Sequence, residues 1–580
     1  MVWERPERDH RRLGRWRFEL RGDELADLRF DDGRVLRSIR AVVRDRDWDT
    51  AGLVVEGIES GPDAITLRVR SDGLGSSFRG TVRATAAGEQ LTVAMDLVSA
   101  DPFLTNRTGL VVLHPPGVAG APLAVRHWDG TVRTTVFPEQ ISPHQPATGI
   151  AALEWRDGSY RIAVRFEGDT FEMEDQRNWS DASFKTYSRP LALPFPYQLA
   201  AGERVTQSVT VTATALPRTG RVRPTADEIR LTPEGPFPEV STSAATAPDP
   251  GPAPAPGGAL IVELDLAWPG WSAALRRAAS SGRPLDVRLV LPDSGPAAAL
   301  SAAVAALRPH RIARMTAFWA SGPARHVCDA EATDMLRSAL AAAGLRAPVT
   351  GGVRSHFTEL NREQHRLATD LDGVVFALTP LFHCLGTEQA VESVAVQRLI
   401  ARQAVRIAAG APVFVGPITL RPHFNDVATT PPRRPSFADL REGYGPHLSA
   451  GTDPRQTALE LAAWTVASAA ALSVPGVAGL SYFEDWGPRG LRDGTGDDHP
   501  AARAVAALAA LGGSTALTGD SPDGLVWALG GVDAVGATTV HVANLDHRAR
   551  VVDVVVSDRR ATITLDAYAW GTVATPTTRP

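Results

Sequence analysis

The sequence predicts a multidomain α/β plus all-β chain, in which a central (β/α)8 TIM barrel is flanked by an N-terminal β-sandwich and a small C-terminal β-domain. Two observations support this. Short runs of alternating apolar and polar residues fill the first 215 of the 580 residues and return after residue 511, as expected of half-buried strands. Between these regions, short apolar segments alternate with helical ones, which is typical of βα units. We therefore expect domains at 1–215, 235–511 and 512–580, with a linker at 216–234.

The N-terminal region has the clearest strand pattern. Alternating runs such as Trp16 to Leu20, Gln90 to Leu97 and Val205 to Ala213 are bounded by turn clusters such as Asp31-Asp32-Gly33. We find no long amphipathic helix among them. An all-β sandwich is the natural way for such strands to bury one face.

The central region predicts eight barrel strands, which we place at 239–244, 260–266, 286–292, 313–319, 348–352, 373–379, 412–420 and 479–486. Helices are expected between most of them, at 271–281, 297–307, 330–343, 388–409 and 453–472. The first helix is expected to be missing, because the stretch 246–258 is rich in proline, glycine and alanine. A doubly wound sheet is the alternative, but no glycine-rich phosphate fingerprint follows any predicted strand.

Composition narrows the function classes. The net charge of −5 gives no electrostatic reason to expect nucleic acid or an anionic membrane as partner. The charged start of the chain lacks the apolar core of a secretory signal, and no run reaches the ~18–20 apolar residues that span a bilayer. The two cysteines, Cys328 and Cys384, suit a reducing compartment. We expect a cytoplasmic protein with a small-molecule partner, and the sequence leaves its oligomeric state open.

One basic residue is unusual. The chain has 60 lysines and arginines, and Lys185 is the only lysine. Lysine offers a compact, titratable ammonium, whereas arginine offers a planar fork that stays charged. We therefore expect Lys185 to serve a site where arginine does not fit.

Lys185 lies in the stretch of the N-terminal region with the most mixed charge, FEMEDQRNWSDASFKTYSRPLALPFPY at 171–197. Charges of both signs beside Trp and Tyr indicate either a sugar-contacting set or a buried network between domains. The candidate substrate-binding residues here are Glu174, Asp175, Arg177, Asn178, Trp179 and Tyr187.

The barrel adds candidates, because TIM-barrel active sites lie at the carboxyl ends of the strands. Those ends carry further candidate substrate-binding residues, namely His356, Asn361, Arg362 and Trp486. Glu484 is our first candidate for the general base, since aromatic neighbours would raise its pKa toward neutrality. Its alternative role is an ion pair with Arg489, in which case Glu359 becomes the candidate base. The candidates for a cation or hydrogen-bond donor beside such a base are Lys185, Arg177 and a histidine.

We expect neither a metal nor a cofactor. His383 and His423 stand singly, and no pair of histidines has metal-ligand spacing. Carboxylates from separate strands can still converge on a metal ion, which the sequence does not settle.

Four segments carry a resemblance to a known family. MEDQRNWSDASFKTY, FPEQISPHQP (137–146), FTELNR (357–362) and SYFEDWGPRGL (481–491) resemble the bacterial D-apionate lactonases. The resemblance covers essentially the whole chain and implies the same order of domains. It implies hydrolysis of a sugar-acid lactone, D-apionolactone to D-apionate. The Pro-rich first barrel connection and the loop GGVRSHF depart from the family pattern, so the substrate can differ while the reaction class is retained.

Two other functions compete. A barrel beside a β-sandwich also suits a glycoside hydrolase, which needs two carboxylates flanking the bond. The expected fourth and seventh strands end in MTAFWAS and PITLRPH, without a carboxylate, although Glu359 and Glu484 would provide a relocated pair. The other possibility is a carbohydrate-binding protein without catalysis, because fold alone does not determine function.

Overall fold

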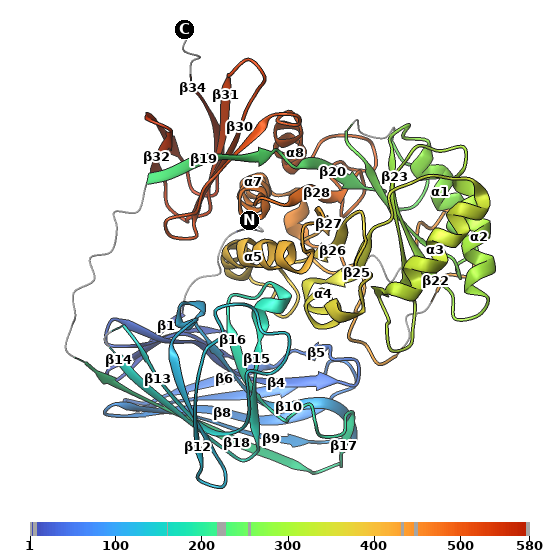
Figure 1. Ribbon diagram of the computed structural model, residues 1–580. Helices are drawn as coiled ribbons and strands as arrows, with labels where there is room; N and C mark the ends of the chain where they lie inside the picture. Colours follow the sequence, from blue (N-terminus) through green and yellow to red (C-terminus); the bar gives the residue numbers. More distant parts are fainter. Residues whose placement is uncertain are drawn as a thin grey trace.

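The computed structural model describes residue 3 and residues 9–158, 160–216, 228–252, 257–430, 434–445 and 451–575. Figure 1 shows the barrel and the C-terminal sheet side by side, with the N-terminal β-domain below the barrel next to helices α4 and α5. The predicted fold class is confirmed, with an N-terminal antiparallel β-domain, a parallel β/α barrel and a small C-terminal sheet.

The N-terminal domain is a single antiparallel sheet of 18 strands around one apolar core. Its large buried side chains include Trp16, Phe30 and Trp155. The strands are β1 (Asp9–Leu13), β2 (Trp16–Arg21), β3 (Glu24–Phe30), β4 (Gly33–Asp45), β5 (Thr50–Ala51), β6 (Val54–Ser60), β7 (Ala64–Ser71), β8 (Phe78–Ala87), β9 (Gln90–Ser99), β10 (Phe103–His114), β11 (Pro122–His127), β12 (Val132–Val136), β13 (Ala147–Asp157), β14 (Tyr160–Glu167), β15 (Phe171–Asp175), β16 (Phe184–Ser188), β17 (Tyr197–Leu199) and β18 (Arg204–Ala215). Two short 3-10 helices are η1 (Pro116–Val118) and η2 (Gln176–Trp179).

The barrel strands follow one another as parallel neighbours. They are β20 (Glu239–Ser243), β21 (Leu260–Asp265), β22 (Leu285–Leu291), β23 (Ile312–Trp319), β25 (Gly351–His356), β26 (Val374–Leu378), β27 (Val413–Ile418) and β28 (Val477–Glu484). A parallel bridge from Met315 to Val349 joins β23 to the segment before β25 and closes the circle. The short β24 (Val327–Cys328) pairs antiparallel with β25. Every residue of β22 is buried, as expected of a strand covered on both faces.

The helices lie between the strands, as predicted. They are α1 (Trp271–Ala279), α2 (Pro296–Leu307), α3 (Ala330–Ala343), α4 (Phe357–Glu363), α5 (Thr387–Ile407), α7 (Glu460–Leu472) and α8 (Pro500–Ala509), with 3-10 helices η3 (Gln364–Arg366) and η4 (Pro454–Thr457). Between β20 and β21, the described residues 244–252 and 257–259 contain no helix. The fifth strand begins and ends a few residues later than expected and leads directly into α4.

The C-terminal sheet contains one strand, β19, that precedes the barrel in the chain, whereas its other strands follow the barrel. Its strands are β19 (Glu228–Pro236), β29 (Thr515–Thr518), β30 (Val526–Val532), β31 (Thr538–Asn544), β32 (Arg550–Val556), β33 (Arg559–Leu565) and β34 (Trp570–Thr575). β19 pairs parallel with β32 and antiparallel with β29. The latter part of the expected linker 216–234 is therefore a strand, because Ile229 and Leu231 alternate with exposed neighbours and enter the apolar core of this sheet. The other expected domain limits stay predictions.

Helix α7 connects the two neighbouring domains. Residues Leu461 to Leu472 are all buried, since α7 packs against α5 and α8 in the barrel and against β30 and β31 in the C-terminal sheet. The helix expected at 453–472 is therefore present over the latter part of that range. Among the described residues, no helix has both the length and the apolar character needed to cross a membrane.

Candidate active site at the barrel mouth

A cavity of about 290 Å³ opens at the carboxyl ends of the barrel strands. TIM-barrel chemistry takes place at this end. The charged and histidine side chains that line the cavity are Glu263, Asp265, Arg288, Asp293, Arg325, His326, Arg354, His356, His423 and Arg434. Three aromatic side chains also line the cavity, namely Trp268, Phe424 and Tyr444. A mostly enclosed space with a few convergent polar groups is what a small-molecule site requires.

The imidazole of His356 occupies a position suited to acid–base chemistry. His356 is the last residue of β25 and the N-cap of α4. Its Nδ1 lies 3.0 Å from Oδ2 of the buried Asp426, on the loop after β27. Its Nε2 is buried and has no hydrogen-bond partner within the structure described, and the residue lines the cavity. A carboxylate that holds one ring nitrogen leaves the other free to accept a proton.

Glu359 lies beside this pair, in the first turn of α4. It accepts a hydrogen bond from Ser355 Oγ at 3.0 Å and interacts with Asp426. Burial and the neighbouring charge of Asp426 raise the pKa of Glu359 well above its usual value. Burial alone would also raise the pKa of Asp426, but the charge and hydrogen bond of His356 outweigh burial and lower that pKa. Glu359 therefore holds a proton while Asp426 stays ionised.

These three residues are also the candidate metal ligands of the site. One nitrogen of His356 and one carboxylate oxygen each from Glu359 and Asp426 lie within 4.8 Å of one another. One imidazole and two carboxylates would suit a divalent cation such as Zn²⁺.

The cations of the cavity are held by partners of opposite or neutral charge. Arg354 donates from Nε and Nη2 to both oxygens of Glu263, at 3.2 and 2.5 Å, and its guanidinium lies 4.2 Å from the ring centre of Phe424. Arg434 donates to Asp265 at 2.6 Å. Burial, together with nearby Arg354, lowers the pKa of His326 to about 3. That histidine is therefore neutral at physiological pH.

The N-terminal domain reaches the barrel mouth through the segment that contains Lys185. Trp179 stacks on Phe382 at 4.5 Å between ring centres and lies 5.8 Å from the ring of His356. Its Nε1 donates to Glu174 at 2.9 Å. The other oxygen of Glu174 accepts from Lys185 Nζ at 2.5 Å. This chain of contacts links the predicted N-terminal motif to the histidine, although Trp179, Glu174 and Lys185 do not line the cavity.

The Glu174–Lys185 pair is buried and ionised. Burial lowers the pKa of Lys185 to about 8. Burial alone would raise the pKa of Glu174, but Lys185, His383 and Arg362 outweigh it and hold that pKa far below its usual value. Both groups carry their charge at neutral pH.

The other N-terminal candidates make polar contacts, some within their own domain and some with the barrel. Arg177 Nη2 donates to Asp175 at 2.7 Å and to Pro138 O at 2.7 Å. Asn178 accepts from Asn361 at 2.9 Å, and its carbonyl accepts from Thr358. The remaining predicted residues are placed as follows: Arg362 donates to Pro143 O and Tyr187 donates to Glu172. None of these side chains lines the cavity, and the contacts of Asn178 and Arg362 cross between the N-terminal domain and the barrel.

Glu484 ends β28 as expected, but it does not line the cavity. Its carboxylate accepts from Arg489 Nη2 at 2.5 Å and from Thr246, through the backbone N at 3.0 Å and Oγ1 at 2.8 Å. The neutral His423 lies 4.0 Å away. Trp486 packs near Ala245 and Ala247, with Arg277 5.4 Å from its ring centre. These contacts match the ion-pair alternative for Glu484.

Asp426 is a central residue that sequence reasoning missed. It follows the seventh strand in the stretch HFND, where His423 and Asn425 are the more conspicuous polar residues. Hydrogen bonds to the N-terminal domain fix this loop. Asp47 Oδ1 accepts hydrogen bonds from the backbone N of Thr429 at 3.0 Å and of Thr430 at 2.7 Å. Asn425 donates to the carbonyl of Asp47 at 2.9 Å.

Known proteins resemble the chain over most of its length. A family model described as “D-apionate lactonase, N-terminal domain” matches residues 2–216, and one described as “D-apionate lactonase, TIM barrel domain” matches residues 238–513. A curated D-apionate lactonase from Brucella anthropi is 29% identical over 529 residues, covering 84% of each chain.

Two solved structures show more distant similarity. A GH51 arabinofuranosidase from Xanthomonas axonopodis pv. citri is 9% identical, with a TM-score of 0.40 and coverage of 60% of this chain and 98% of that one. A putative aldose 1-epimerase from Escherichia coli K12 is 12% identical, with a TM-score of 0.26 and coverage of 36% and 99%.

Proposed function

We propose that this chain, which belongs to the D-apionate lactonase family, hydrolyses the ring ester of a sugar-acid lactone, with D-apionolactone as the first substrate to test. The observation that carries the proposal is the His356–Asp426 pair at the cavity. The histidine lines the cavity, its buried Nε2 has no hydrogen-bond partner in the described structure, and its Nδ1 is held by a carboxylate. Ester hydrolysis needs a base in that position.

The reaction begins with proton transfer from water. His356 Nε2 accepts a proton from a water molecule as its oxygen attacks the lactone carbonyl carbon, and Asp426 stabilises the resulting imidazolium. The ring C–O bond then breaks, and the departing ring oxygen takes the proton from His356. The products are a free hydroxyl and a carboxylic acid, which ionises in water. General-base assistance of this kind is worth about 10²–10⁴ in rate.

The charge that develops on the carbonyl oxygen needs a donor nearby. Arg354 is the cation of the same strand and lines the same cavity. We propose that the N–H groups of Arg354 that Glu263 does not occupy stabilise the oxyanion, while Glu263 and Phe424 fix the plane of the guanidinium. Preorganised donors of this kind contribute about 10²–10³ in turnover.

The charge balance of the cavity favours an uncharged, hydroxyl-rich substrate. Its arginines are already engaged: Arg354 with Glu263, Arg434 with Asp265, Arg288 with Asp286, and Arg325 with backbone carbonyls. A phosphorylated sugar would have to displace those partners. Carboxylates and aromatic rings instead suit the hydroxyls and the apolar face of a neutral lactone.

We assign Lys185 and Glu174 a positioning role. Their ion pair holds the indole of Trp179, which contacts His356. The protonated Glu359 donates a hydrogen bond to the ionised Asp426 and keeps that carboxylate oriented, and Glu484 stabilises the end of β28.

The decisive assay uses purified protein with a panel of aldonolactones in weak buffer, following acid release. We expect hydrolysis of D-apionolactone or a close relative, and loss of that activity in His356→Ala. Release of reducing sugar from aryl glycosides would instead support a glycoside hydrolase. Inactivity toward both substrate classes would support a binding protein.

The same assay is repeated after exhaustive dialysis against EDTA. Because the proposed mechanism uses no metal, activity should persist. Activity that is lost and then restored by a divalent cation would assign His356, Glu359 and Asp426 to a metal.

A further inference from the structure

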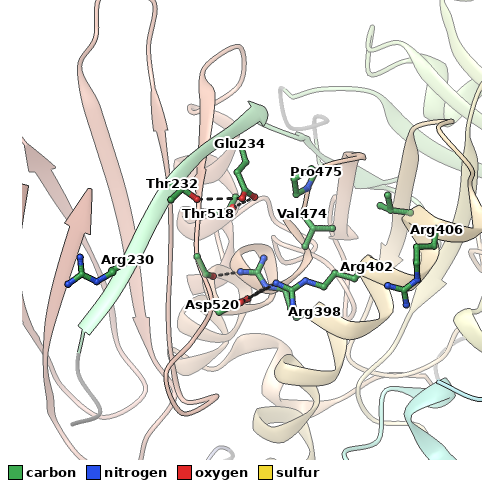
Figure 2. A pocket seen from close by; sticks show the side chains of 12 residues that line it. Arg230, Thr232, Glu234, Arg398, Arg402, Arg406, Val474, Pro475, Thr518 and Asp520 are labelled. Atoms are coloured by element: carbon green, nitrogen blue, oxygen red, sulfur yellow. Dashed lines mark hydrogen bonds and ion pairs between the residues drawn. The ribbon is translucent and has the colours of Figure 1, made fainter. Parts of the chain in front are cut away.

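A second cavity, of about 510 Å³, lies at the opposite end of the barrel from the candidate active site. Its walls come from the C-terminal half of α5, from the turn before β28, and from β19 and the end of β29 in the C-terminal sheet. Figure 2 shows this space between the barrel helix and the sheet. In a TIM barrel this end is usually structural, so the composition of the cavity needs its own explanation.

The wall from α5 carries three arginines in register. Arg398, Arg402 and Arg406 are spaced four residues apart and therefore lie on one face of the helix, about 6 Å apart along its axis. Arg230 of β19 also lines the cavity, but its guanidinium forms an ion pair with Glu228 at 2.6 Å. Figure 2 shows Arg398 and Arg402 beside Asp520, with Arg406 further along α5. Like charges on one helix face are destabilising unless an anion lies between them.

The carboxylates of the cavity do not balance these cations. Asp520 is shared, accepting from Arg398 Nε at 3.1 Å and from Arg402 Nη2 at 2.9 Å. Glu234 accepts from Thr518 Oγ1 at 2.7 Å. Arg406 is exposed and has no ion-pair partner among the residues whose positions are described. Arg230 is already paired with Glu228 at 2.6 Å, so the three arginines of α5 face two carboxylates, Asp520 and Glu234, in a chain whose net charge is −5.

The individual contacts show which guanidinium groups are available. Arg398 is fully engaged, because it also donates to the carbonyls of Ala470, Ser473 and Gly519. Arg402 uses only Nη2, and half of its side chain is exposed. Arg402 and Arg406 therefore present free N–H donors one helical turn apart, next to the apolar surface of Val474 and Pro475.

We propose that this cavity binds a small oxyanion with at least two negative charges, such as a phosphate ester or a polycarboxylate, held by Arg402 and Arg406. Arginine recognises both groups by charge-assisted hydrogen bonds from its planar fork. The ligand would touch the barrel and the C-terminal sheet together, so its binding also stabilises the contact between them. The proposal is independent of the lactonase assignment.

The test uses two probes on the intact chain, inorganic pyrophosphate and citrate, titrated by calorimetry at low ionic strength and without divalent cations. We expect one molecule per chain and a rise in Tm. Tighter binding of pyrophosphate would identify a phosphate ligand, and tighter binding of citrate a carboxylate ligand. Absence of binding by both probes at millimolar concentration would overturn the proposal.

Two variants distinguish binding at this cavity from nonspecific binding to surface charge. Arg406→Glu should weaken the probe at least about tenfold and should fold normally, because the exposed side chain of Arg406 makes no hydrogen bond or ion pair with the residues that the structure describes. Arg276→Glu, an exposed arginine in the last turn of α1, is the matched control and should bind as the parent does. Equal binding by the parent and Arg406→Glu would refute the site, while lactone hydrolysis should be unchanged in both variants.

Discussion

The imidazole of His356 and the carboxylate of Asp426 come from positions 70 residues apart and meet at 3.0 Å beside the barrel cavity. Each is fixed by its own element: His356 by the junction of β25 and α4, and Asp426 by a loop that the N-terminal domain holds. A histidine oriented by a buried carboxylate is the arrangement that general-base catalysis requires.

Asp426→Asn should inactivate the protein while leaving it folded. The amide can donate to Nδ1 and thereby place the ring proton on Nε2, where it blocks proton acceptance. We expect kcat for the lactone to fall by about 10²–10⁴ with a Tm close to that of the parent. Full turnover in a folded Asp426→Asn variant would remove this pair from the mechanism.

Glu359→Gln should flatten the dependence of stability on pH. Burial and Asp426 raise the pKa of Glu359 in the folded state, whereas the unfolded value is about 4.3. The stabilising contribution of this residue is therefore fully present below about pH 4 and is lost as the pH rises through the raised folded pKa. The loss is about 1.4 kcal/mol for each pH unit in that window.

Glutamine cannot ionise but still offers an N–H donor to Asp426. Urea unfolding of the parent and Glu359→Gln at several pH values between 5 and 9 measures the effect. The variant should gain stability relative to the parent toward alkaline pH. If the free energy of unfolding depended on pH in the same way in both proteins, the pKa of Glu359 would not be raised in the folded state.

Asp47→Ala should impair catalysis although Asp47 belongs to the N-terminal domain and not to the barrel. Asp47 accepts the backbone N–H groups of Thr429 and Thr430, and their loop carries Asp426. Small displacements of a catalytic group cost up to about a hundredfold in rate, so we expect kcat to fall about ten- to a hundredfold. Amide hydrogen exchange in residues 424–430 should rise in parallel.

Asp129→Ala is the matched control for that variant. Asp129 also accepts a backbone N–H and a hydroxyl, but from Thr131 within its own exposed turn. Its turnover should equal that of the parent. Similar losses in both variants would point to general destabilisation of the N-terminal domain.

Lys185→Arg should destabilise the domain contact despite conserving charge. Lys185 is buried against Glu174 at 2.5 Å, and a larger guanidinium overpacks such a site at a cost of about 1–3 kcal/mol. Displacement of Glu174 would also free Trp179 next to His356, so we expect kcat to fall about tenfold. Lys185→Met, which removes the ammonium group that contacts the buried Glu174, should lose more stability. An arginine variant as stable and active as the parent would contradict this role.

The fold could be predicted largely from periodicity, and the exception is instructive. The barrel units repeat a local pattern, so their strands and helices can be located one at a time. β19 shows only Ile229 and Leu231 in alternation, and its neighbour β32 lies more than 300 residues away. Nothing local distinguishes such a short strand from a linker.

The site could be predicted only in part, for a related reason. His356 and Glu359 follow a barrel strand directly, so their place at the mouth can be inferred from strand position. Asp426 belongs to an aperiodic loop, and its approach to His356 depends on contacts with Asp47 from another domain. The N-terminal motif stands out in the sequence because charges of both signs lie beside Trp and Tyr. Composition alone does not distinguish contact with a substrate from contact between domains.

Glu484→Gln should separate structure from catalysis at the end of β28. The carboxylate receives hydrogen bonds from Thr246 and from Arg489, and all but about 1% of its surface is buried. The amide would leave the buried guanidinium of Arg489 without a compensating charge, which costs about 3–5 kcal/mol. We expect a clear fall in Tm and in the urea midpoint, with turnover per folded molecule within about twofold of the parent. Asp485→Asn, which removes the negative charge of a buried carboxylate that accepts from Arg283, is the comparison and should also lower stability. A Glu484→Gln variant that keeps its stability and loses turnover by 10² or more would restore Glu484 as the base and displace His356 from that role.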